Sequence, residues 1–156
     1  MQADEALNAA KALAANNGTV NTNLGAIARQ KGDHNAASTY YGKASGGQEL
    51  NYNKGVLAIT QGDYGRAISS MGTNNTLNLA LAKILNDDAN GARTTLENSG
   101  DDSAVAHYLM AICAARLKDN AGVKKHIEMA VEKDANLRGR AQSDLEFRNH
   151  KAALGL

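Results

Sequence analysis

NYNKGVLAITQGDYGRAI, at residues 51–68, is the stretch that decides the fold. It places a small residue, Gly55, seven positions before the Gly-Asp pair 62–63, and an alanine, Ala67, four positions after the aspartate of that pair. Glycine readily adopts the left-handed backbone conformation that ends a helix, and aspartate accepts hydrogen bonds from the free N–H groups that begin one. The stretch therefore predicts two helices joined by a tight turn, with small residues where the helices approach closely.

The same turn phrase recurs along the chain. It reads QKGDHNAA at 30–37, TQGDYGRA at 60–67, LNDDANGA at 85–92 and LKDNAGV at 117–123. Together with ADEALNAA near the N-terminus, this register aligns Ala6, Ala37, Ala67, Ala92 and Val123 at spacings of 31, 30, 25 and 31 residues. One hairpin cannot bury its apolar face alone, so the sequence predicts hairpins that stack on their neighbours.

A second phrase precedes three of these turns. It reads NTNLG at 21–25, NYNKG at 51–55 and TLNLA at 76–80, and each copy has an asparagine two positions before the small residue. The fourth unit has Ala111 in the place of the small residue and Leu109 in the place of the asparagine. The two phrases together predict a first helix of roughly three turns in each hairpin.

These phrases resemble the tetratricopeptide repeat (TPR), most clearly in the opening stretch and in NLGAIARQKGDHNAASTYYGKA at 23–44. The TPR consensus has a Leu-Gly pair in the first helix, a Gly-Asp-Tyr turn and an alanine in the second helix. The resemblance implies an all-α fold, a right-handed α-solenoid of antiparallel helical hairpins. Two features depart from the family: the chain contains no proline to close its repeats, and the spacing of 25 residues is well below the usual length of about 34. A related Sel1-like array is the alternative.

The register predicts a single TPR-like domain over 1–156. Its expected elements are an orphan half-repeat helix at 3–16, hairpins at 19–45, 48–71, 75–97 and 102–133, and a C-terminal capping helix at 136–152. Solenoid ends require a more polar cap, and the last of these segments has that character. Because the chain starts in mid-repeat, we expect either a piece of a longer array or a partner that covers the N-terminal edge.

TPR proteins bind ligands in a concave groove lined by the first helix of each hairpin, and the resemblance transfers those groove positions to this chain. The candidates are Asn23, Arg29, Tyr52, Asn53, Val56, Ile59, Leu77, Asn78, Leu81, Ile84, Tyr108, Ile112 and Arg116. In one interpretation they bind an extended or helical peptide, with the asparagine amides contacting its backbone. In the other, the aliphatic side chains pack against neighbouring helices and each asparagine bonds within its own hairpin.

Composition argues against several other functions. Lys+Arg (17) and Asp+Glu (16) nearly balance to a net charge of +1, so no basic surface for nucleic acid or an anionic membrane is expected. The N-terminus lacks an uninterrupted apolar core, and we expect no membrane insertion. The four histidines fall in different repeats with no i, i+4 pair, and the one cysteine, Cys113, sits in the small, apolar segment AICAA. We therefore expect no catalytic, metal or cofactor site, and no enzyme.

The sequence thus predicts a protein-interaction scaffold that binds a peptide or protein through its groove or its open N-terminal edge. The alternative is a purely structural terminal segment of a larger repeat protein that self-associates, as a homo-oligomer, through that edge. The phrase KDANLRGRAQSDLEF at 133–147 resembles the ends of irregular TPR stretches in bacterial proteins, often of the cell envelope. A periplasmic or envelope location is the expectation that follows, with the cytoplasm next.

Overall fold

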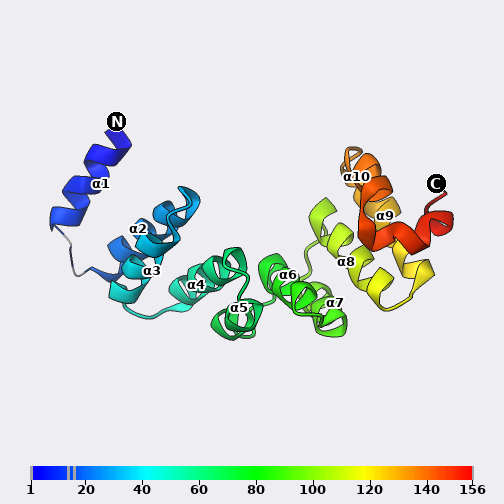
Figure 1. Ribbon diagram of the computed structural model, residues 1–156, viewed down its shortest axis with the longest axis horizontal. Coiled ribbons are helices and arrows are strands. Elements are labelled where there is room, and N and C mark those ends of the chain that lie inside the picture. The colour runs from blue at the N-terminus through cyan, green and yellow to red at the C-terminus, as the bar shows by residue number, and fades with distance from the viewer. Residues whose placement is uncertain (1, 14, 16, 156) are drawn as a thin grey trace. The chain divides into compact units, whose positions relative to one another are not determined.

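The computed structural model describes residues 2–13, 15 and 17–155, and these residues form helices and no strand (Figure 1). The prediction of an all-helical fold is confirmed for this part of the chain. In chain order the elements are α1 (Gln2–Leu13), α2 (Gly18–Gln30), α3 (His34–Lys43), α4 (Gln48–Thr60), α5 (Tyr64–Met71), α6 (Leu77–Leu85), α7 (Ala89–Ser99), α8 (Ala104–Arg116), α9 (Asn120–Lys133), α10 (Leu137–Ser143) and the 3-10 helix η1 (Leu145–Leu154). Positions 14 and 16, within the helix expected at 3–16, lie outside the described residues.

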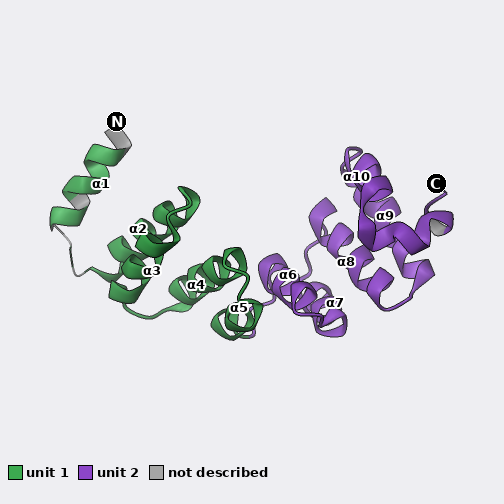
Figure 2. Cartoon of the chain, in the orientation of Figure 1, with its two compact units in different colours: residues 1–72 green, residues 73–156 purple. Residues whose placement is uncertain are grey.

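The chain divides into two compact units, residues 1–72 and residues 73–156 (Figure 2). In the first unit α2 packs on α3 and α4 packs on α5, while α3 and α2 both contact α4, and α1 contacts α2. In the second unit α6 packs on α7 and α8 packs on α9, while α7 and α6 both contact α8. Within each unit, therefore, the helices pack sequentially and the first helices of successive hairpins are neighbours.

The four turns inside the hairpins share one backbone geometry. Each has a residue with positive φ followed by an aspartate whose carboxylate accepts a hydrogen bond from the backbone N–H three residues later, which satisfies a free donor at the helix start. The positive-φ residues are Gly32 (80°), Gly62 (75°), Asp87 (60°) and Lys118 (61°), and the capping aspartates are Asp33, Asp63, Asp88 and Asp119. The backbone N–H of each aspartate also donates to the carbonyl five residues earlier, at Ala28, Ala58, Lys83 and Ala114.

Lys118 bears strain at the last of these turns, because a residue with a Cβ is disfavoured at its φ of 61°. Lys118→Gly should raise the free energy of unfolding by about 0.5–1 kcal/mol, since relief of left-handed strain (about 1–2 kcal/mol) exceeds the extra chain entropy that glycine loses (about 0.4–1 kcal/mol). Lys125→Gly, at an exposed position inside α9, should lower it by about 1 kcal/mol. Urea unfolding monitored by circular dichroism measures the free energy of unfolding of each variant. If both substitutions change it in the same direction, the prediction is wrong.

The small residues of the repeated phrases lie where paired helices cross. Gly25, Gly55, Ala80 and Ala111 of the first helices and Ala37, Ala67, Ala92 and Val123 of the second are all buried. A Cβ built on Gly55 would lie 2.6 Å from the Met71 Cγ, and one built on Gly25 would lie 2.3 Å from a ring carbon of Tyr41. At these two crossings the hydrogen of glycine is thus part of the packing.

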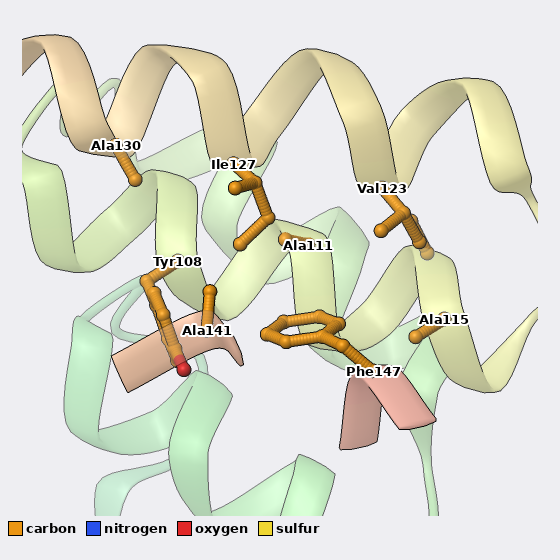
Figure 3. Packing of buried hydrophobic residues seen from close by; sticks show 9 residues of the cluster. Tyr108, Ala111, Ala115, Val123, Ile127, Ala130, Ala141 and Phe147 are labelled. Atoms are coloured by element: carbon orange, nitrogen blue, oxygen red, sulfur yellow. The ribbon is translucent and has the colours of Figure 1, made fainter. Parts of the chain in front are cut away.

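The second unit holds the largest apolar cluster, and Phe147 of η1 lies in it with no exposed surface. Figure 3 shows Val123 and Ile127 projecting from α9 into this cluster, beside Ala111 of α8 and Phe147. The ring of Phe147 meets that of Tyr108 edge to face, with centroids 5.6 Å apart. In the first unit a smaller cluster forms around Tyr41, Leu50 and Leu57.

The C-terminal segment differs from the sequence prediction of one capping helix at 136–152. The helix is interrupted at Asp144, whose backbone is extended with a ψ of 126°. Helix α10 lies before this residue and η1 lies after it. The Asp144 carboxylate accepts a hydrogen bond from the Glu146 N–H and so caps the new helix. After the bend, Phe147 packs in the apolar cluster that residues of α8 and α9 form.

Candidate interaction surfaces

In the first unit the candidate residues lie on the adjacent helices α2 and α4. On α4, Tyr52, Asn53, Val56 and Ile59 are all half-buried. Half-buried aliphatic side chains keep part of their surface in water and can bury more against a partner. The four residues, which we call the α4 strip, therefore remain candidates for contact with a ligand.

The two candidates on α2 lie in different surroundings. Asn23 is exposed, whereas Arg29 is half-buried and its Nε has no hydrogen-bond partner among the described residues. The buried asparagine of this helix is Asn21, which was not among the candidates. Its side-chain amide donates to the backbone carbonyls of Ala15 and Asn17, at 3.2 and 3.0 Å, so it ties the start of α2 to the residues that precede it.

In the second unit the candidates divide into accessible and buried residues. Leu77, Asn78 and Leu81 of α6 are half-buried, and we call them the α6 strip. Ile84 is only 2% exposed and Tyr108 only 6%, and both belong to apolar clusters. For these last two the expectation of a groove position is wrong, because their side chains pack in the core and offer no surface to a ligand.

Tyr108 is fixed by polar as well as apolar contacts. Its hydroxyl donates to the Asp144 carboxylate over 2.7 Å, and the guanidinium of Arg140 lies 5.5 Å from the centre of its ring. Burial raises the pKa of this hydroxyl, and the hydrogen bond to Asp144 raises it further. The contact between Tyr108 and Asp144 therefore joins α8 to the bend between α10 and η1.

Arg116 also holds elements together within the second unit. Its Nε lies 3.1 Å from the Glu146 carboxylate of η1, and its Nη1 donates to the Ile84 carbonyl and lies 3.3 Å from the Asp87 carboxylate. Because the nitrogens of its guanidinium bond to partners on both sides, Arg116 links the α6–α7 turn to η1. Ile112, one turn earlier on α8, is half-buried and packs against two apolar clusters.

The two larger pockets described here lie outside the predicted groove. One, of about 520 Å³, is an open pocket between α9, α10 and η1 with apolar and charged residues in its lining; it is lined by Lys124, Ile127, Glu128, Val131, Glu132, Arg138, Ala141, Ala152, Leu154 and Gly155. The sequence pattern did not predict it because a single straight helix at 136–152 would form no such pocket.

The other pocket, of about 620 Å³, lies in the first unit beside α3, α4 and α5, and polar side chains dominate its lining: Ser38, Tyr41, Gly42, Lys54, Leu57, Gln61, Asp63, Arg66 and Ser70. Among the described residues the buried Tyr41 hydroxyl has no hydrogen-bond partner. Arg66 donates to the Gln61 side chain and lies 3.4 Å from the Asp63 carboxylate, so it is held at the α4–α5 turn beside the pocket.

Of the side chains that could carry chemistry, Cys113 lies in the core and two histidines meet between α8 and α9. Cys113 has no exposed surface, and burial raises the pKa of its thiol to about 11, so the nucleophilic thiolate is scarce at neutral pH. Among the described residues no three histidine, cysteine or carboxylate side chains come close enough together to hold a metal ion. His107 and His126, which appear scattered in the sequence, do meet across α8 and α9.

Comparison with known proteins adds no relative to this picture. No helix in the described part of the chain is both long and apolar enough to cross a membrane. Neither a protein-family model nor a curated protein matches the chain.

Proposed function

We propose that this chain is a TPR-type, right-handed α-solenoid that binds a peptide or protein and catalyses no reaction. The observation that carries the proposal is the repetition of one turn geometry, a positive-φ residue and a capping aspartate, at four places in the chain. Each turn is flanked by small residues at the crossing of its two helices. Repeated hairpins of this kind present the surface of their first helices side by side, which is how helical arrays bind extended segments.

We propose one binding surface in each unit, the α4 strip in the first and the α6 strip in the second. Each strip combines half-buried aliphatic side chains with an asparagine, Asn53 in one and Asn78 in the other. The aliphatic groups can bury surface against apolar side chains of a ligand, and a side-chain amide can both donate to and accept from a peptide backbone. The partner that fits is therefore a mainly apolar peptide segment, bound as an extended chain or as a helix.

Charge placed in one of the strips should weaken the binding of peptides to that strip. Peptides are first selected on the parent chain from a displayed library of random sequences, and their dissociation constants are then measured by fluorescence anisotropy. Val56→Asp should weaken the binding of peptides held by the α4 strip, and Leu81→Asp the binding of peptides held by the α6 strip. Each loss should be at least about tenfold, or about 1.4 kcal/mol, because a carboxylate must be desolvated against the apolar ligand. Asn51→Asp in α4 and Asn86→Asp after α6, both at exposed positions, should leave the dissociation constant unchanged.

Two results would count against the proposal. If the two strip variants bind the selected peptides as well as the parent does, the ligand lies elsewhere. If they lose binding only together with a fall in melting temperature, Val56 and Leu81 support the fold and do not form a binding surface. A concentration-dependent dimer in sedimentation, lost when residues 2–13 are removed, would favour the self-associating structural segment instead.

A further inference from the structure

His107 of α8 and His126 of α9 meet through the same ring atom. Their Nδ1 atoms are 3.2 Å apart, the ring centroids are 5.4 Å apart and the ring planes differ by 22°. The distance between the centroids exceeds the distance between the two Nδ1 atoms by about one ring diameter. Each Nδ1 therefore points at the other along the line that joins the two rings. This is the geometry of a hydrogen bond between two imidazoles, which requires a proton on one Nδ1 and a lone pair on the other.

The second nitrogen of His107 fixes which ring donates. His107 Nε2 lies 2.7 Å from the Asp102 Oδ1, and a carboxylate only accepts, so Nε2 carries a proton. When the ring is neutral its Nδ1 is then the acceptor, and the donor must be the Nδ1–H of His126. The tautomers are thus assigned by the network: the Asp102 carboxylate accepts from His107, and His107 accepts from His126.

The contact tolerates one additional proton but not two. With one, either ring can be the imidazolium while the other keeps a lone pair at Nδ1, and the hydrogen bond survives. With two, both Nδ1 atoms carry hydrogen and the contact sets two N–H groups and two positive charges against each other. His107 is buried and cannot turn its ring to water without leaving the α8–α9 contact.

Two carboxylates lie near His107, and a lysine pairs with one of them. Asp102, in the loop before α8, bonds its Nε2, and the second oxygen of that carboxylate lies 2.6 Å from the Nζ of Lys133 on α9. Asp101 is close enough for His107 to act on its charge. Lys133 and His107 both lower the pKa of Asp102, the lysine more, so this carboxylate stays ionised throughout the range in which histidine titrates.

His126 is the ring on which the second proton is unfavourable. Burial lowers its pKa most, the charge of His107 lowers it next and Lys125 adds to the effect, while Asp119 and Glu97 of α7 oppose them. The folded state then binds fewer protons than the unfolded state as the pH falls below the ordinary histidine pKa of about 6.5. Stability from this ring is complete above that pH and is lost as the pH falls toward the lowered pKa of the folded state.

From this geometry we propose that the His107–His126 contact is a proton-sensitive clasp, which holds α8 to α9 at neutral pH and opens when both rings are protonated. The proposal does not depend on the proposed function, since it concerns the hairpin of α8 and α9 alone. Opening the clasp loosens the helix pair that carries Tyr108 and Ile127, residues of the apolar cluster of the second unit. The chain would thereby respond to acidification across the range of pH in which histidine changes charge.

Amide hydrogen exchange of the full chain tests the clasp between about pH 7.5 and about pH 5, which bracket the ordinary histidine pKa of about 6.5. After correction for the intrinsic pH dependence of exchange, amides of α8 and α9 should lose protection by about tenfold or more at the lower pH. His126→Gln, which cannot titrate, should remove most of this change. His34→Gln, in the first unit, should leave it as it is in the parent.

Imidazole nitrogen NMR spectra of the parent protein supply a second test that needs no variant. The expected spectrum at neutral pH has His107 protonated at Nε2 and His126 protonated at Nδ1, with the pKa of His126 below the ordinary histidine value. Protonation of both neutral rings at Nε2, or a His126 pKa at or above the ordinary histidine value, would overturn the proposal. The clasp would likewise be wrong if the exchange of α8 and α9 kept its full pH dependence in His126→Gln.

Discussion

Phe147→Ala should lower the free energy of unfolding by about 3–5 kcal/mol, the cost of truncating a fully buried phenylalanine. The side chain has no exposed surface, meets the ring of Tyr108 edge to face at 5.6 Å and packs in the same cluster as Ala111 and Ala141. Alanine would leave a cavity bounded by helices on several sides, which cannot all move inward together. The substitution would also remove the apolar contact that stabilises the bend at Asp144.

Urea unfolding followed by circular dichroism measures this loss, and Leu145→Ala is its matched control. Leu145 begins the same helix η1 but is 79% exposed, so its truncation should change stability by no more than about 0.5 kcal/mol. If the two variants unfold at the same urea concentration, η1 does not pack on α8 and α9 as described.

Gly25→Ala is the second large effect, and it should destabilise the chain by about 1–3 kcal/mol although alanine ordinarily favours a helix. The new Cβ would lie 2.3 and 2.4 Å from two ring carbons of Tyr41. Tyr41 cannot swing away because only 1% of it is exposed, so α2 and α3 must separate. The sign of the change is thus set by packing across the hairpin and not by helix propensity.

Gly42→Ala is the control for this substitution. Gly42 lies inside α3, and nothing is within 4 Å of the Cβ that alanine would add. It should therefore stabilise the chain by about 0.5–1 kcal/mol, the ordinary gain over glycine in a helix. Pairing Gly25→Ala with Tyr41→Leu, which has a smaller side chain at the point of contact, should recover part of the loss. Equal effects at positions 25 and 42 would show that the α2–α3 crossing is looser than described.

Much of the fold could be predicted from the sequence because its determinants are local. Proline is absent, and the turn phrases combine a residue suited to positive φ with an aspartate that can cap the next helix. At Gly32 and Asp33 both requirements are met within two residues, so the turn can be predicted without knowing what surrounds it. The all-helical class follows from the repetition of such turns.

The candidate surface was harder to predict, because α8 does not have one apolar face. In α8, AVAHYLMAICAAR, nearly every position is apolar or small, so the sequence pattern does not indicate which side meets the core. Tyr108 and Ile84 were assigned to a groove on the register of a resemblance, and tertiary packing buries both. The α4 strip could be recognised as accessible only from the packing of α2 and α4.

Contacts between residues far apart in the chain also could not be predicted from the sequence. The bend at Asp144 is favoured because Phe147 finds a site between α8 and α9, and no local signal specifies that site. His107 and His126 are 19 residues apart on different helices, so no i, i+4 spacing indicates their meeting. In each case the deciding partner belongs to another element.

The sequential packing of the helices has a consequence for how the chain acquires its structure. Each helix of a hairpin finds its main partner immediately before or after it, as α2 does in α3 and α8 in α9. Only short stretches of chain must close before such contacts form, so little loop entropy opposes the first steps. A nascent chain could therefore fold hairpin by hairpin as it is synthesised, without waiting for residues from its other end.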